Sequence, residues 1–149
     1  MKIGLAADVG GHLTQMDAIM TKEVLGDNGI VYFTKDNPRA DKIKHKKYLF
    51  KEMGYNPFKY ILPIMRFYKI MKKEHIKIII TTGAEMGLIA VIAGKLLGIK
   101  TVYIDSIICA KYPTLPVYLG YFFIDELLIQ NKQVLKRVGK KAKYVGGIL

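Results

Sequence analysis

The chain has 149 residues, of which 51% are hydrophobic, and a formal net charge of +12 at pH 7. This length predicts one domain with a core of its own. No apolar stretch approaches the roughly 20 residues of a spanning helix, and the first residues resemble a core strand and not a signal peptide, so we expect a cytoplasmic protein. The single cysteine, Cys109, excludes an internal disulfide and is typical of a buried thiol without a function.

The positive charge comes almost entirely from lysine, because only three of the 24 basic residues are arginines. The basic residues form three groups, which are Lys42, Lys44, Lys46, Lys47 and Lys51; Lys69, Lys72, Lys73 and Lys77; and Lys132, Lys136, Arg137, Lys140, Lys141 and Lys143. Arginine is the usual residue for bidentate recognition of bases and phosphates, so lysine-rich charge favours a diffuse anionic surface. Nucleic acid and anionic lipid headgroups are the candidates, and mere solubility is the plain alternative.

Short apolar runs alternate with helical patterns, which is typical of parallel strands joined by right-handed crossovers. In chain order we expect strands at 2–7, 30–34, 48–50, 76–81, 101–104, 127–129 and 143–145. Between them we expect helices at 13–25, 56–73, 85–97, 115–123 and 131–138. The first helix would place Leu13, Met16, Met20 and Val24 on its buried face. The prediction is one α/β domain over 1–149, with a doubly wound, mainly parallel Rossmann-like sheet.

The first strand runs into Asp8, Val9, Gly10, Gly11 and His12, directly before a helix. Paired glycines let the backbone approach a diphosphate, and the helix start offers free N–H groups and a positive dipole end. His12 is a candidate general base or a donor to phosphate, since its pKa suits either role near neutrality. An ordinary tight turn and a helix-capping histidine are the alternatives.

Two further polar junctions follow later strands. Thr82, Gly83 and Glu85 come after the strand at 76–81, and Asp105 with Ser106 after the strand at 101–104. Ligands of open parallel sheets bind outside the carboxyl ends of the strands, so these side chains could hold hydroxyls of a sugar or ribose. The alternatives are a carboxylate that stabilises its own helix start, and capping. We find no metal-ligand cluster, no nucleophile elbow and no phosphate-binding loop of the Gly-x-x-x-x-Gly-Lys-Ser/Thr type.

The helix predicted at 56–73 is entered through an Asn-Pro pair and has more apolar residues than one buried face requires. A narrow basic stripe runs along it, and Pro63 should kink it. The surplus apolar side chains need a lipid surface or a partner chain. As membrane-binding residues we single out Phe58, Lys59, Ile61, Leu62, Met65, Arg66, Lys69 and Lys73.

Three motifs in this order give the sequence a specific resemblance. They are a strand ending in Gly-Gly-His-Leu, then Ile-Thr-Thr-Gly-Ala-Glu-x-Gly, then Lys-Leu-Leu-Gly-x-Lys-Thr-x-Tyr-Ile-Asp-Ser. The chain resembles the membrane-associated subunits of split UDP-N-acetylglucosaminyltransferases of lipid-linked oligosaccharide synthesis, the asparagine-linked glycosylation protein fourteen family, and their prokaryotic polysaccharide-biosynthesis relatives. The resemblance spans most of the chain, and 80–106 is its most diagnostic part.

The resemblance implies the N-terminal, membrane-facing half of a GT-B glycosyltransferase, whose donor-binding half is a separate chain. It implies that Gly10, Gly11 and His12 line the cleft near the diphosphates, and that Thr82, Gly83, Glu85, Asp105 and Ser106 line its acceptor side. Asp8 stands where the family usually has a small residue. A carboxylate beside a diphosphate must be protonated, paired or used as the base, so Asp8 and His12 are both candidate catalytic residues.

The expected function is thus an acceptor-binding subunit at the cytoplasmic face of the cell membrane. With its partner it would move a sugar from a UDP-sugar to a polyprenyl-diphosphate-linked saccharide, without a metal or cofactor of its own. Activity is expected only from the pair. One alternative is a lysine-rich nucleic-acid-binding module. Two observations argue against it: arginines are scarce, and the aromatic residues lie mainly in apolar runs. Another is a stand-alone nucleotide-binding enzyme.

Overall fold

The computed structural model describes residues 1–26, 28–54, 56–106 and 111–147, so Cys109 lies outside the described residues. The strands are β1 (Lys2–Ala6), β2 (Gly29–Lys35), β3 (Lys46–Phe50), β4 (Ile78–Thr81), β5 (Lys100–Ile104), β6 (Glu126–Ile129) and β7 (Ala142–Tyr144). The α-helices are α1 (Gly11–Ile19), α2 (Lys22–Leu25), α3 (Ile61–Lys73), α4 (Ala84–Leu96), α5 (Leu115–Gly120) and α6 (Lys132–Leu135). Short 3-10 turns are η1 (Ala40–Lys42), η2 (Pro57–Tyr60) and η3 (Tyr121–Phe123).

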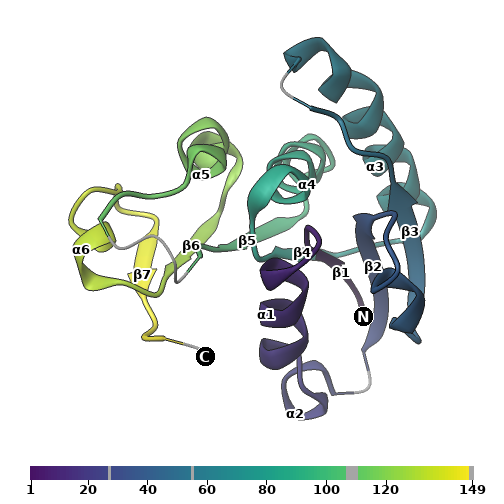
Figure 1. Cartoon of the computed structure of the whole chain (residues 1–149), viewed down its shortest axis with the longest axis horizontal. Coiled ribbons are helices and arrows are strands. Elements are labelled where there is room, and N and C mark those ends of the chain that lie inside the picture. The colour runs from purple at the N-terminus through teal and green to yellow at the C-terminus, as the bar shows by residue number, and fades with distance from the viewer. Residues whose placement is uncertain (27, 55, 107–110, 148–149) are drawn as a thin grey trace.

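The described strands form one sheet in the order β3-β2-β1-β4-β5-β6-β7, and every neighbouring pair is parallel. Helices α3, α4 and α5 cover one face of this sheet, and α1 with α2 covers the other (Figure 1). The central strands β1 and β4 are largely buried and mostly apolar in sequence, whereas the edge strands β3 and β7 are partly exposed and contain lysines. This arrangement confirms the predicted doubly wound α/β fold.

The core follows the alternation of side chains along the strands. Between the sheet and α3 and α4, the ring of Phe67 lies 4.2 Å from that of Phe33 and 5.0 Å from that of Phe50, measured between centroids. On the other face, Leu5 of β1 packs with Leu13 and Met16 of α1. A third buried cluster joins α4, α5, α6 and the strands beside them. Sheet and helices are therefore held by apolar contacts on both faces.

The single helix predicted over 13–25 is wrong, because α1 ends at Ile19 and α2 begins separately. The carbonyl oxygen of Thr21 accepts the amide hydrogens of Val24 and Leu25, so threonine, a favoured N-cap residue, starts a new helix. The break turns Val24 outward, where it is 60% exposed and not buried as expected.

The helix predicted over 56–73 is confirmed with a change of type. Asn56 accepts the amide hydrogen of Phe58 at 3.0 Å, as its position before Pro57 predicts. The first turn is the 3-10 turn η2, and α3 begins only at Ile61. Pro63 therefore lies in the first turn of α3, where its missing N–H removes no intrahelical bond and no kink is needed.

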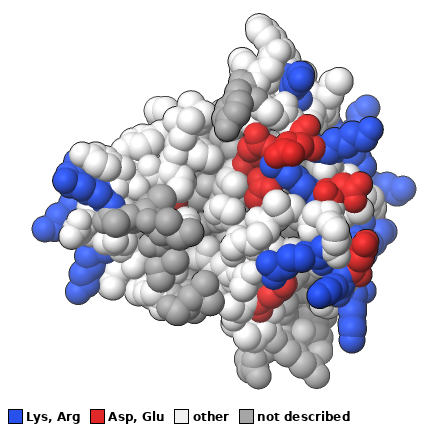
Figure 2. Space-filling view, in the orientation of Figure 1, with Lys and Arg blue, Asp and Glu red and all other residues white. Residues whose placement is uncertain are grey.

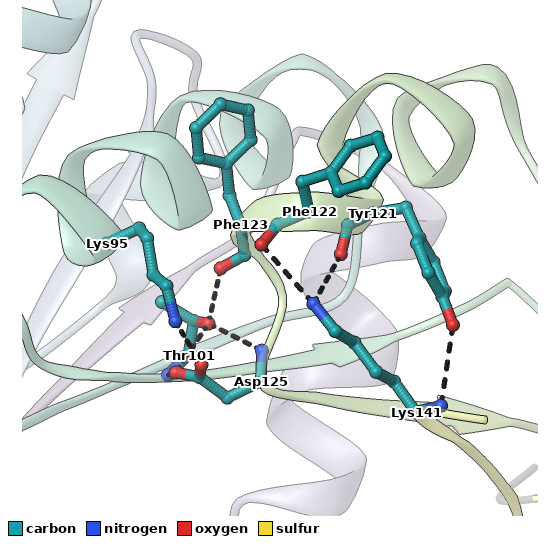
Figure 3. A network of polar contacts seen from close by, with 7 residues as sticks. All are labelled: Lys95, Thr101, Tyr121, Phe122, Phe123, Asp125 and Lys141. Atoms are coloured by element: carbon teal, nitrogen blue, oxygen red, sulfur yellow. Dashed lines mark hydrogen bonds and ion pairs between the residues drawn. The ribbon is translucent and has the colours of Figure 1, made fainter. Parts of the chain in front are cut away.

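Polar contacts fix the last third of the sheet at the amino-terminal ends of its strands (Figure 3). Asp125, just before β6, accepts hydrogen bonds from Lys95 of α4 at 2.7 Å and from the amide of Thr101 in β5 at 2.9 Å. Lys141, just before β7, donates to the carbonyl oxygens of Tyr121 and Phe122 in η3. These bonds connect α4, β5, η3 and the edge strand. The predicted helix at 131–138 is wrong in length, since α6 ends at Leu135.

Candidate functional site

The predicted junctions after β1 and β4 lie next to each other in the fold. The chain passes outward from β1 through β2 to β3 and then returns to place β4 on the other side of β1. Ala6 and Thr81, at the ends of these strands, are paired in register. In open α/β sheets this switch point is where ligands bind. The fold thus brings Asp8–His12 together with Thr82–Glu85.

Glycines begin the helix at each junction. Gly10 has φ 75° and Gly83 has φ 110°, in a region that favours glycine. Each is the N-cap residue of its helix, α1 or α4, without a side-chain cap, so the first amide groups of the helix remain for a ligand. A Cβ placed on Gly10 or Gly11 would meet no atom within 4 Å. The first turn therefore borders open space, as close approach of a phosphate requires.

His12 is held by Thr82 from the opposite junction. Nδ1 of His12 lies 2.7 Å from the carbonyl oxygen of Thr82, and the hydroxyl of Thr82 donates to the carbonyl oxygen of His12 at 2.8 Å. A carbonyl only accepts, so Nδ1 must donate, and the neutral ring then has an unprotonated Nε2. A Cβ on Gly83 would lie 3.5 Å from Cε1 of His12, which shows how closely the second turn packs under the ring. This arrangement presents a base.

A buried ionic network joins the same junctions. Nζ of Lys35, the last residue of β2, lies 3.2 Å from Asp8 and 2.8 Å from Glu85. Glu85 also accepts a hydrogen bond of 2.8 Å from the hydroxyl of Tyr60. Asp8 further accepts the amide of Val9 at 2.9 Å and is 5% exposed. Asp8 is thus a paired carboxylate, and the network ties β1, β2, η2 and α4 together.

Lys35 and Tyr60 were not predicted as site residues. Burial alone would lower the pKa of Lys35, but its bonds to Glu85 and Asp8 raise it above the ordinary lysine value. Burial and the bond to Glu85 raise the pKa of Tyr60 to about 12, so the hydroxyl stays protonated. The sequence did contain a signal for Lys35 as a site residue, because this charged residue stands at the end of an apolar strand, just as Asp8 stands after the end of another. Tyr60 stands in an apolar run and gave none.

Asp105 and Ser106 follow β5, the next strand of the sheet beyond β4. Asp105 is 1% exposed, and its Oδ1 accepts the hydroxyl of Thr114 at 3.0 Å. Its Oδ2 is buried without a hydrogen-bond partner among the described residues. Burial raises the pKa of this carboxyl above its ordinary value, and the bonds from Thr114 and from the backbone only partly offset it. Asp105 therefore keeps one buried carboxylate oxygen without a described hydrogen-bond partner at this edge of the sheet.

The membrane-binding residues proposed from sequence divide into an apolar and a basic group on η2 and α3. Phe67 and Met71 are buried, and the surplus apolar side chains form what we call the α3 patch, Phe58, Ile61, Leu62 and Met65, each 47–78% exposed. The basic residues Lys59, Arg66, Lys69 and Lys73 are also exposed. Within the described ranges, no helix has both the length and the apolar character to cross a membrane.

A second exposed apolar group lies on α5 and η3. Leu115, Tyr118, Leu119 and Phe122 are 51–81% exposed. The sequence predicted this segment only as an ordinary helix. Basic side chains, in contrast, gather at two separate ends of the face in Figure 2, over α6 and β7 and around β3 and α3, with red carboxylates among the second group.

No family model matches the chain, and no curated protein does, but solved structures are similar to it. MurG from Acinetobacter baumannii gives a TM-score of 0.80 at 13% identity, over 98% of this chain and 45% of that one. The UDP-GlcNAc 2-epimerase from Methanocaldococcus jannaschii gives 0.73 at 14% identity, over 99% and 46%. A glycosyltransferase from Rickettsia africae ESF-5 gives 0.71 at 12% identity, over 97% and 42%.

Identities this low establish the fold alone. The chain spans less than half the length of each of these structures. It therefore has the Rossmann-like fold of one half of a GT-B-like protein, which confirms the predicted fold class.

Proposed function

We propose that this chain is the acceptor-binding, membrane-associating half of a two-chain glycosyltransferase. It would act with a donor-binding chain to move a sugar from a UDP-sugar to a polyprenyl-diphosphate-linked saccharide. The observation that carries the proposal is the His12–Thr82 pair at the switch point of a domain that spans 45% of MurG. The order of the Gly-Gly-His and Thr-Thr-Gly-Ala-Glu motifs along the chain supports the resemblance to the asparagine-linked glycosylation protein fourteen family.

In the proposed reaction, Nε2 of His12 takes the proton of an acceptor hydroxyl. The hydroxyl oxygen then bonds to the anomeric carbon of the donor sugar, while the bond from that carbon to the UDP oxygen breaks. UDP leaves with the bonding electron pair. Thr82 keeps the His12 ring in the required tautomer, since its carbonyl oxygen accepts the Nδ1 proton.

The remaining site residues would bind the acceptor. The backbone at Gly10 and Gly11 borders open space, because a Cβ at either position would meet no atom within 4 Å, and this backbone would approach a diphosphate. Asp105, with a buried oxygen free of described partners, would accept a saccharide hydroxyl, and Ser106 and Gly83 lie at the same edge. Asp8 and Glu85 are bonded to Lys35, so we assign them to positioning and His12 to the proton transfer.

The α3 patch would attach the domain to the membrane. Its apolar side chains are exposed beside Lys59, Arg66 and Lys69, a combination that suits insertion at an anionic interface. The first residue of the α3 patch, Phe58, lies in η2. The last residue of η2, Tyr60, donates a hydrogen bond to Glu85 at the edge of the site. A lipid-linked acceptor would then reach the site from the surface that carries its lipid.

The test is reconstitution of the pair. The tagged chain is purified with its co-isolated donor-binding subunit, and transfer from UDP-GlcNAc to a short-chain polyprenyl-diphosphate saccharide is measured for the pair and for each chain. We expect transfer from the pair only. Full activity of this chain alone would overturn the two-chain proposal, and release of an epimerised UDP-sugar without transfer would instead support an epimerase half.

A further inference from the structure

A surface pocket of about 330 Å³ lies between the end of β3 and the start of α3, apart from His12. It is lined by Phe50, Lys51, Glu52, Met53, Lys59, Leu62, Pro63 and Arg66. Its floor is rigid, because Phe50 is 2% exposed and its ring stacks on the buried Phe67. The pocket thus combines an apolar floor with a charged rim.

The rim is positive. Lys51, Lys59 and Arg66 form no ion pair with any residue in the described ranges. The only acidic lining residue, Glu52, is exposed and lies 3.7 Å from Nζ of Lys35. Three cations against one carboxylate leave the lining with a net charge of +2.

Arg66 is positioned on this floor. Its guanidinium carbon lies 4.6 Å from the centre of the Phe50 ring, a cation–π contact that uses none of its hydrogen-bond donors. A guanidinium fixed in this way can bind two oxygens of one phosphate group. Lys51 and Lys59 would add charge at the rim.

The pocket is continuous with the α3 patch. Leu62 lines the pocket and is 78% exposed, and Phe58 and Ile61 of the α3 patch precede it on η2 and α3. A ligand that places a phosphate beside Arg66 could lay an apolar chain over these residues. The combination indicates an amphiphile and not a free anion.

We propose that this pocket binds the phosphomonoester headgroup of an anionic lipid, with its acyl chains against the α3 patch. A phosphomonoester carries about −1.5 to −2 charge at pH 7, which matches the net charge of the lining. The inference rests on the membrane-associating part of the proposed function and adds a headgroup preference to it. Attachment becomes selective for lipid chemistry, and not only for surface charge.

The experiment is flotation with phosphatidylcholine vesicles that contain either phosphatidic acid or phosphatidylserine, adjusted to the same surface potential. We expect about tenfold tighter binding to phosphatidic acid, from the added charge-assisted bonds. Arg66→Lys keeps the charge but loses bidentate geometry, and Lys51→Gln removes one rim charge. Both variants should bind the two vesicle types equally. The matched control Lys69→Gln removes a charge from the same helix outside the pocket and should weaken both bindings without changing their ratio.

Equal binding of the wild-type chain to both vesicles would overturn the headgroup pocket and leave membrane attachment intact. Absence of binding to any vesicle would overturn membrane attachment itself. A binding measurement with glycerol 3-phosphate distinguishes a lipid headgroup from a free phosphomonoester, because this compound has the headgroup of phosphatidic acid without its acyl chains. Affinity for it equal to that for phosphatidic acid vesicles would overturn the lipid assignment. Thermal melting of each variant verifies that it is folded.

Discussion

His12 can act as a base only while Nδ1 stays protonated and Nε2 does not, and Thr82 provides that condition. We predict that His12→Gln, whose amide can still donate to the Thr82 carbonyl, lowers the kcat of the pair by about 10²–10⁴. The change should leave the KM for the acceptor nearly unchanged. Steady-state kinetics across pH 5 to 9 provide the measurement.

Asp8→Asn is the variant to compare with His12→Gln, since it removes a charge at the same junction after β1. It weakens the bond to Lys35 and should reduce the free energy of unfolding by about 1–3 kcal/mol, while the pH dependence of kcat remains. If Asp8→Asn abolishes that dependence and His12→Gln retains it, the assignment of the base to His12 is wrong.

For single residues, the sequence predicted which side chains follow the ends of β1, β4 and β5, because the carboxyl ends of parallel strands lie at the same edge of the sheet. It could not show what neutralises Asp8. That partner, Lys35, is 27 positions away in the chain, and only the pairing of β1 with β2 brings the two together. The bond between Tyr60 and Glu85 depends likewise on the packing of α3, which follows η2, against α4. The roles of Gly10, Gly11, Thr82, Gly83, Glu85, Asp105 and Ser106 in binding substrate stay predictions.

Among the elements, α3 is fixed to the sheet by Glu74, the C-cap residue that follows its last turn. Glu74 is 3% exposed and bonds to Lys2 of β1 and to Lys46 and Tyr48 of β3. The bonds from Lys46, Tyr48 and Lys2 outweigh burial and lower the pKa of Glu74 to about 2. The folded pKa lies below the unfolded value, so this stabilisation is present above pH 4.5 and is lost as the pH falls toward 2.

We therefore predict that Glu74→Gln reduces the free energy of unfolding by about 1–3 kcal/mol at pH 7, and that the difference from wild type shrinks between pH 5 and 2. Urea unfolding at several pH values measures it. Asp36→Asn, a change at an exposed carboxylate, is the control and should stay within about 0.5 kcal/mol. A constant difference between wild type and Glu74→Gln across this range would contradict the assigned pKa.

The elements themselves were largely predictable, since the central parallel strands are mostly apolar and alternate along the chain with helical patterns. The differences arose where local backbone bonds interrupt a longer apolar pattern. Thr21 divides the helix predicted at 13–25, and η2 replaces the first turn of the helix predicted at 56–73. Such local bonds leave the apolar period of the sequence unbroken, so the sequence pattern does not show them.

For the whole molecule, the two facts that matter are its extent and its charge. The chain spans 42–46% of the GT-B-like structures to which it is similar, so it corresponds to less than half of each of them. On the face shown in Figure 2, the basic side chains lie at two ends and not along one continuous track. A nucleic-acid backbone follows a continuous track, whereas a membrane needs only an apolar contact with cations around it.

Substitutions in the α3 patch test whether its apolar side chains bind a membrane. Phe58 and Leu62 are each 78% exposed, so Phe58→Ser with Leu62→Ser removes apolar surface from the α3 patch without opening the core. Full burial of one such side chain in lipid is worth about 1.5–3 kcal/mol, so the double variant should lose at least about tenfold in partition to anionic vesicles. Leu96→Ser, an equally apolar change at a 60% exposed site at the end of α4, should lose nothing.

The salt dependence of binding distinguishes a membrane from a nucleic acid as the ligand. Binding to nucleic acid falls steeply as the salt concentration is raised, whereas apolar insertion into a membrane does not. Wild-type binding to vesicles should retain a salt-resistant part that the double variant lacks. If salt removes all binding and the double variant equals wild type, the lysines and not the α3 patch determine the partner, and a polyanion such as nucleic acid becomes the better candidate.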